Sequence, residues 1–197
     1  MSSLQTDNSH LAEKVRLRAD TVRLIQKPQI RVCEAFAGDG VIWRAVKKQF
    51  PDKKINVLRI DKKEDKKGIY LKGDNIKFLM SLDLSKFDII DLDAYGSPAK
   101  QLDVVFNSGF SGLVHCTFIQ SGFGMLDSSI LNANGFSSDM VDKCPTLFCK
   151  NGIQKMQNYL GNNGVKEIHG YFIDRKNYFW FNLDNSLKDN KLHPLSN

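Results

Sequence analysis

Strand-like and helical stretches alternate along most of this chain. Short apolar runs rich in β-branched residues are separated by segments with the apolar period of a surface helix. This alternation is typical of parallel βαβ units, because a parallel strand pair needs a crossover of a dozen or more residues. Strands are expected at 30–36, 55–60, 69–72, 87–93 and 112–119, and helices at about 41–49, 75–82 and 99–107. The pattern predicts five parallel strands joined by right-handed crossovers.

The carboxyl-terminal part breaks this alternation. Two runs rich in β-branched and aromatic residues, VKEIHGYFID and NYFWFNL, are separated only by Arg175 and Lys176. So short a link demands antiparallel pairing. The predicted fold class is therefore α/β: a Rossmann-like sheet of five parallel strands plus a C-terminal antiparallel hairpin, with helices on both faces. Residues 121–161, between the fifth strand and the hairpin, are expected to be helical or irregular.

The length of 197 residues fits one domain, and no linker or internal repeat divides the chain. We therefore expect a single domain over residues 1–197. Its expected parts are a leading amphipathic helix over about 9–26, a catalytic core over about 30–183 and a loose tail over 186–197. Pro28 ends the leading helix, because proline disfavours helical backbone in the residue before it.

The net charge, the apolar pattern and the cysteines indicate which kinds of binding partner to expect. The net charge of +6 favours anionic partners such as nucleic acid. The amino terminus has no apolar signal-peptide core and no stretch approaches the ~18 apolar residues of a membrane span. We expect a cytoplasmic protein with no membrane partner. Cys144 and Cys149 have no second pair of cysteines to complete a zinc site, so we expect no metal.

A glycine-bearing turn follows the first strand-like run, within the segment VCEAFAGDG. Gly38 and Gly40 let the backbone approach a ligand closely, and the helix that follows offers amides to a carboxylate. A dinucleotide-binding G-x-G-x-x-G motif has a third glycine where this chain has Trp43, which argues against nicotinamide and flavin cofactors. We predict that Glu34 and Phe36 also bind the cofactor, and that Glu34 binds the cofactor's ammonium group through a backbone or water contact. The alternative is that the glycines form only a tight turn.

Polar residues also follow the next two strand-like runs. Asp61 ends the run INVLRID, where an acid can hold two ribose hydroxyls, and Lys62 comes directly after it. Asp74 and Asn75 follow the third run, where they can bind an adenine amino group and ring nitrogen, although Asp74 is equally suited to cap a helix. The carboxyl ends of parallel strands meet at one crevice. Together these residues predict a cofactor with an adenosyl group.

The fourth strand-like run ends in DLDAYGSP, residues 91–98. This octapeptide resembles the D-L-D-P-Y-G-S-P signature of the tRNA guanine N2-dimethyltransferases. It is similar, more widely, to the D/N-P-P-Y/F loops of enzymes that methylate exocyclic amino groups. The order of motifs agrees over about residues 30–183, and only the octapeptide is specific to the family. The resemblance implies a class I methyltransferase with S-adenosylmethionine as cofactor and tRNA-like RNA as acceptor.

The resemblance also implies two catalytic residues. In the family, the acid corresponding to Asp93 accepts hydrogen bonds from the target amine, and the aromatic residue corresponding to Tyr95 stacks on the base. An exocyclic amine is a poor nucleophile, so a carboxylate that orients it and helps with its proton suits the reaction. A flat ring suits an extruded base. The alternative is that Asp93 caps the next helix and Tyr95 packs in the core.

One departure from the signature bears on activity, because Ala94 stands where the family has proline. The sequence therefore leaves three functions open: an RNA methyltransferase, a DNA or small-molecule methyltransferase, and an inactive methyltransferase-fold module that binds RNA. Four lysines near the expected crevice are candidates for phosphate contacts, with a solvated surface as the alternative. They are Lys62, Lys63, Lys66 and Lys67.

Overall fold

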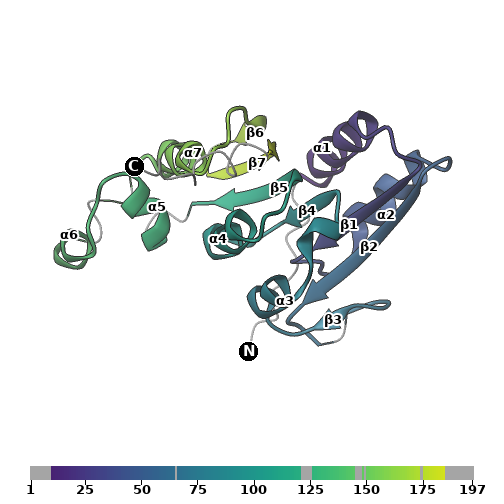
Figure 1. Ribbon diagram of the computed structural model, residues 1–197, viewed down its shortest axis with the longest axis horizontal. Coiled ribbons are helices and arrows are strands. Elements are labelled where there is room, and N and C mark those ends of the chain that lie inside the picture. Colours follow the sequence, from purple (N-terminus) through teal and green to yellow (C-terminus); the bar gives the residue numbers. More distant parts are fainter. Residues whose placement is uncertain are drawn as a thin grey trace, which may run out of the picture.

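The computed structural model describes residues 10–64, 66–120, 126–144, 148, 150–173 and 175–184. At its centre is a seven-stranded sheet with the order β3-β2-β1-β4-β5-β7-β6 (Figure 1). The strands are β1 (Gln29–Glu34), β2 (Lys54–Asp61), β3 (Leu71–Lys72), β4 (Ile89–Leu92), β5 (Gly112–Ile119), β6 (His169–Ile173) and β7 (Lys176–Leu183). Strands β1 to β5 pair in parallel, and β7 pairs antiparallel with both β5 and β6. The predicted fold class is confirmed.

Helices cover both faces of the sheet. They are α1 (Leu11–Leu24), α2 (Val41–Gln49), α3 (Asn75–Ser81), α4 (Ala99–Asn107), α5 (Ser128–Ala133), α6 (Ser138–Lys143) and α7 (Gly152–Asn162). A short 3-10 helix, η1 (Leu84–Lys86), precedes β4. Apolar residues of α1 and α2 form one buried cluster with the sheet, and those of α3, α4, α5 and α7 form the other. The chain order reverses between β1 and β4, which is where open α/β sheets bind ligands.

The expected boundaries agree with the structure to within a few residues. The helices expected at 41–49 and 99–107 and the strand expected at 112–119 have those bounds. The leading helix is about two residues shorter than expected at each end. The fourth strand ends at Leu92, one residue earlier than expected. Asp93 therefore lies in the loop after β4. The tail over 186–197 lies outside the described residues.

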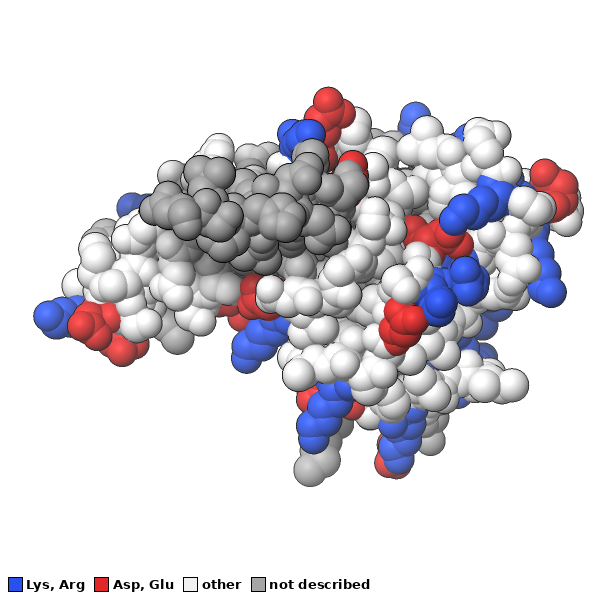
Figure 2. Space-filling view, in the orientation of Figure 1, with Lys and Arg blue, Asp and Glu red and all other residues white. Residues whose placement is uncertain are grey.

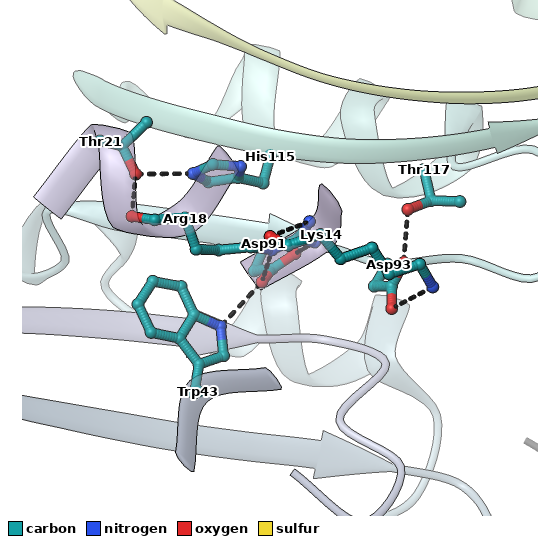
Figure 3. Close-up of polar contacts among 8 residues, drawn as sticks. All are labelled: Lys14, Arg18, Thr21, Trp43, Asp91, Asp93, His115 and Thr117. Atoms are coloured by element: carbon teal, nitrogen blue, oxygen red, sulfur yellow. Dashed lines mark hydrogen bonds and ion pairs between the residues drawn. The ribbon is translucent and has the colours of Figure 1, made fainter. Parts of the chain in front are cut away.

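Helix α1 is attached to the sheet by a buried ion pair (Figure 3). The side chain of Arg18 has no solvent exposure, and its Nε and Nη2 donate to the two carboxylate oxygens of Asp91 at 3.0 and 2.6 Å. Trp43 of α2 donates its Nε1 hydrogen to Asp91 Oδ2 at 2.7 Å from the other side. Removing one partner of a buried pair typically costs about 3–5 kcal/mol, because the other charge is left uncompensated. This pair therefore fixes α1 and α2 on β4.

A buried histidine forms a second contact between α1 and the sheet. Thr21 donates its hydroxyl hydrogen to the carbonyl of Arg18 at 2.9 Å, so its oxygen accepts from His115 Nε2 at 2.9 Å. His115 Nδ1 is buried and has no hydrogen-bond partner among the described residues. Burial, and then the charge of Arg18, lowers the pKa of His115 well below its usual value. The ring is therefore neutral, with its proton on Nε2.

Replacing His115 with Gln should weaken the pH dependence of stability. Because the pKa of His115 is lowered only in the folded protein, the unfolded chain alone takes up a proton as the pH falls below about 6.5. The wild type should therefore lose up to about 1.4 kcal/mol of unfolding free energy per pH unit relative to His115→Gln. The measurement is denaturant unfolding of both proteins between about pH 7.5 and pH 5.

The raised pKa of Glu34 has the opposite effect on stability, since the folded protein holds that proton more tightly than the unfolded chain. This effect is present in both proteins and cancels in the difference. A difference in unfolding free energy that stays constant with pH would contradict the assignment to His115.

Candidate active site

A cavity of about 60 Å³ lies at the carboxyl ends of β1 and β4. Its walls come from α1, the loop after β1, the start of α2 and the loop after β4. Four of the predicted site residues line it: Glu34, Phe36, Gly38 and Asp93. Ligand pockets are usually about 300 Å³ or larger, so this cavity encloses only one end of a ligand of cofactor size. A larger, open hollow of about 580 Å³ is lined by residues of α1 and by Gln49 of α2, and none of its described lining residues is acidic.

Glu34 is a buried acceptor without a donor. Its side chain is 2% exposed, and Oε2 has no hydrogen-bond partner among the described residues. Arg59 Nε lies 4.0 Å away and likewise has no hydrogen-bond partner in the part of the chain that the structure describes. Burial raises the pKa of Glu34 well above its usual range and Asp91 raises it further, while Arg59 acts against both. An unsatisfied buried polar group costs roughly 1–3 kcal/mol, so this position favours a ligand that brings a donor.

The glycine turn is held by residues from the end of β2. Asp61 Oδ2 accepts from the Gly38 amide at 2.8 Å, and Arg59 Nη2 donates to the Gly38 carbonyl at 2.7 Å. Gly40 has a left-handed φ of 65°, and a Cβ there would lie 2.7 Å from Arg59 Nε. Gly40 therefore makes room for Arg59, a reason that the sequence did not show. Lys62, beside Asp61, is exposed.

Asp74 and Asn75 lie at the start of α3. Asp74 Oδ1 accepts from the Ile76 amide at 2.8 Å and caps the helix, which was one of its two expected roles. Asn75 Nδ2 donates to the Ala35 carbonyl at 2.9 Å, and its Oδ1 accepts from Gln101 at 2.9 Å. These contacts tie the third strand end to the first. Binding of an adenine by Asp74 and Asn75 stays a prediction.

Asp93 has a partner on each carboxylate oxygen (Figure 3). Lys14 Nζ of α1 lies 2.9 Å from Oδ2, and Thr117 of β5 donates to Oδ1. Helix α4 begins after Pro98 without a side-chain cap, so the alternative role of Asp93 as a cap is wrong. Tyr95 is 78% exposed, so its alternative role in the core is also wrong. The loop presents one acid toward the cavity and one aromatic ring to solvent.

The loop after β4 is closed by a bond that proline cannot make. The Ala94 amide donates to the Leu92 carbonyl at 2.8 Å, spanning Asp93. The related signature has proline at this position, which has no backbone N–H. Ala94 is buried, with 4% exposure. The alanine therefore replaces the rigidity of proline with a hydrogen bond.

Three residues of the site were not found from the sequence: Lys14, Arg59 and Thr117. For Lys14 a signal existed, since Lys14 and Arg18 stand four residues apart on the face of α1 that also carries apolar residues. Charged residues on such a face need partners. Asp91 and Asp93, two residues apart in the sequence, are the acids that pair with Arg18 and Lys14. For Arg59 and Thr117 we find no comparable signal.

The surface charges are mixed. In the face shown in Figure 2, basic and acidic side chains are interspersed. Lys66 lies 3.8 Å from Asp39, which lines the cavity, and Lys72 pairs with Glu64, which does not line it. Within the described ranges, no group of three or more His, Cys, Asp or Glu side chains is arranged to hold a metal ion. In the same part of the chain, every helix is too short or too polar to span a membrane.

Gly40→Ala should destabilise the protein more than Gly109→Ala does. Both glycines have left-handed φ angles, 65° and 73°, so each alanine should cost roughly 1–2 kcal/mol in backbone strain. A Cβ at Gly109 meets nothing within 4 Å, whereas one at Gly40 must displace Arg59. Denaturant unfolding of the two variants measures the difference. Equal losses would show that the Arg59 side chain moves aside freely.

Comparisons with known proteins give the fold. No protein-family model matches the sequence, and no curated protein matches it. A Listeria monocytogenes protein described as a class I S-adenosylmethionine-dependent methyltransferase has a TM-score of 0.51 at 10% identity, over 99% of this chain and 66% of that one. A Methanococcus maripaludis protein described as an S-adenosylmethionine-dependent methyltransferase has a TM-score of 0.48 at 13% identity, over 92% of this chain and 96% of that one. S-adenosylhomocysteine-bound PaMTH1 of Podospora anserina has a TM-score of 0.48 at 16% identity, over 93% and 80%.

Identities this low establish architecture only. The strand order, the parallel core and the antiparallel β7 agree with that architecture. This chain has the Rossmann-like fold of the class I methyltransferases.

Proposed function

We propose that this chain is an S-adenosylmethionine-dependent methyltransferase that acts on an exocyclic amino group of a nucleobase in RNA, in the manner of tRNA-modifying enzymes. The observation that carries the proposal is the shared cavity of Glu34 and Asp93. It contains a buried acid, one oxygen of which has no hydrogen-bond donor among the described residues, and a second acid with a partner on each carboxylate oxygen. One acid suits the ammonium group of the cofactor and the other suits an acceptor amine.

The residues around the cavity carry chemical groups that suit the parts of the proposed cofactor. Glu34 Oε2 would accept from its ammonium group, and the glycine turn after β1 would lie against its methionine part. Asp61 lies at the end of β2, where an acid can hold ribose hydroxyls. Its two oxygens accept from the amides of Gly38 and Lys63, and each oxygen has a second lone pair for a ligand. Phe36, Gly40, Lys62, Asp74 and Asn75 complete the proposed cofactor residues.

The proposed reaction is direct attack of the amine on a methyl group. When bound, S-adenosylmethionine supplies that electrophilic methyl group. Asp93 accepts a hydrogen bond from the target amine, aims its lone pair and offers an acceptor for the proton that the amine loses. Tyr95 offers its exposed ring as a stacking surface for the base. The proton-accepting atom is a carboxylate oxygen of Asp93.

A second candidate is a methyltransferase-fold module that binds RNA without catalysis. It is favoured by the bond from Ala94 to Leu92, which closes the catalytic loop in a way that the related signature cannot. A DNA or small-molecule methyltransferase is the third candidate. The net charge of +6 favours a nucleic acid over a neutral small molecule. We place the reaction in the cytoplasm.

S-adenosylhomocysteine should bind with release of a proton, whereas NAD should not bind. The raised pKa of Glu34 means that its carboxyl holds a proton more readily than usual, and an ammonium group beside it favours the ionised form. Calorimetry in buffers of different ionisation enthalpy measures the released proton. Glu34→Gln should bind at least about tenfold more weakly and release none, because a charge-assisted hydrogen bond is lost.

The control for Glu34→Gln is Glu64→Gln, which neutralises an exposed acid outside the cavity. Its affinity for S-adenosylhomocysteine should match that of the wild type. No binding of the methyl donor or of its product at millimolar concentrations would overturn the proposed cofactor.

Asp93→Asn should lower turnover by about 100- to 10,000-fold with S-adenosylhomocysteine affinity retained, since the carboxylate acts on the acceptor. Tyr95→Ala should instead weaken acceptor binding by roughly 1–3 kcal/mol. The assay is transfer of a labelled methyl group to total RNA, DNA and nucleosides. Met80→Ala, which truncates another exposed apolar side chain, is the control.

An undiminished rate for Asp93→Asn on RNA would show that Asp93 is not catalytic. Binding of both cofactor and RNA without methyl transfer by the wild type would favour the inactive module. Transfer to DNA or to free nucleosides alone would favour the third candidate.

A further inference from the structure

Helix α1 matches two cations to two carboxylates of one strand segment. Lys14 and Arg18 are four residues apart in the helix. Asp91 in β4 and Asp93, the first residue after β4, are two residues apart. Four helical residues rise about 6 Å and two strand residues about 6.6 Å, so the two spacings agree. Arg18 pairs with Asp91 and Lys14 with Asp93. The helix therefore runs antiparallel to the strand.

The two pairs differ in burial. The side chains of Arg18 and Asp91 are 1% and 0% exposed, whereas those of Lys14 and Asp93 are 11% and 12% exposed. Arg18 also donates from Nη1 to the Lys14 carbonyl at 3.4 Å, which links the anchor to the backbone of Lys14 itself. The inner pair therefore sets the place of α1. The outer pair lies at the cavity, which Lys14 and Asp93 both line.

The two partners of Asp93 restrict its rotation. Thr117 contacts Oδ1 from β5, and Lys14 contacts Oδ2 from α1. Lys14 is itself held over the ring of Tyr178 on β7, with Nζ 5.3 Å from the ring centroid. Because residues of α1 and β5 contact its two oxygens, the carboxylate keeps one orientation, and its remaining lone pairs keep fixed directions. Reaction rates depend steeply on such geometry, since a misplacement of about 1 Å can cost about 100-fold.

We propose that Lys14 is a positioning residue for methyl transfer, which it promotes by holding Asp93 toward the acceptor amine. This proposal rests on the proposed function. It makes the leading helix part of the catalytic apparatus, through Arg18 as anchor and Lys14 as the contact. Lys14 touches neither the amine nor the transferred methyl group. Its effect is exerted entirely through Asp93.

The experiment compares Lys14→Met, Lys14→Gln and Lys14→Arg with Asp93→Asn and with the double variant of Lys14→Met and Asp93→Asn. The control is Arg16→Met, which removes an exposed cation from the same helix. Methyl transfer gives kcat and KM, calorimetry gives the S-adenosylhomocysteine affinity, and circular dichroism gives the melting temperature. Lys14→Gln serves where Lys14→Met does not fold.

We expect Lys14→Met to lower kcat by about 10- to 100-fold, with cofactor affinity changed by less than about threefold. Lys14→Arg should recover most of the rate, because a cation again reaches Asp93. In the Asp93→Asn background, Lys14→Met should cause no further loss. This complete non-additivity is the result that a merely structural role would not give.

Three results would overturn the proposal. One is an active wild type with an undiminished rate for Lys14→Met, and another is an equal loss for Arg16→Met. The third is a cofactor affinity that falls tenfold or more in Lys14→Met, which would make Lys14 a ligand of the cofactor. A wild type that binds S-adenosylhomocysteine and methylates no acceptor would instead overturn the proposed function, and the role of Lys14 with it.

Discussion

The bidentate pair between Arg18 and Asp91 is the interaction on which the site depends. It places a buried guanidinium against a fully buried carboxylate, and Trp43 supplies a third hydrogen bond. Such a pair is tolerated in a protein interior only when both charges are fully hydrogen-bonded. Because it joins α1, α2 and β4, it sets the position of the residues that line the cavity. Lys14 reaches Asp93 only because Arg18 is anchored one turn later.

The fold was predictable because its signals are local. Strand and helix periods are read over windows of a dozen residues, and the two-residue link expected at Arg175 and Lys176 leaves antiparallel pairing as the only geometry. In the structure Lys176 already belongs to β7. The register of β7 with β6 follows from a link this short, whereas its register with β5 does not. The same local patterns predicted that Glu34, Asp61, Asp74 and Asp93 follow or end four successive strands, as they do in the structure. The helix and strand periods of the sequence do not predict which side chains contact each other.

The contacts of the site are non-local, which is why they were missed. Gly40 was expected to make room for a ligand, but its space is used by Arg59, a residue on the next strand. Asn75 was expected to bind an adenine, yet its amide joins the carbonyl of Ala35 to Gln101 of α4. Polar groups at strand ends therefore hold the edge of the sheet together, whatever they bind. Position in the chain predicted their location, and only the structure gives their partners.

The docking of α1 has a consequence for how the chain folds. Arg18 and Asp91 are separated by 73 residues, Lys14 and Asp93 by 79, and Thr21 and His115 by 94. Contacts between residues so distant in the chain form late, because the entropy of closing a long loop opposes them. During synthesis α1 can make these contacts only after β4 and β5 have left the ribosome. Its two cations therefore stay hydrated until then, and the candidate site forms only after β4 and β5 are available.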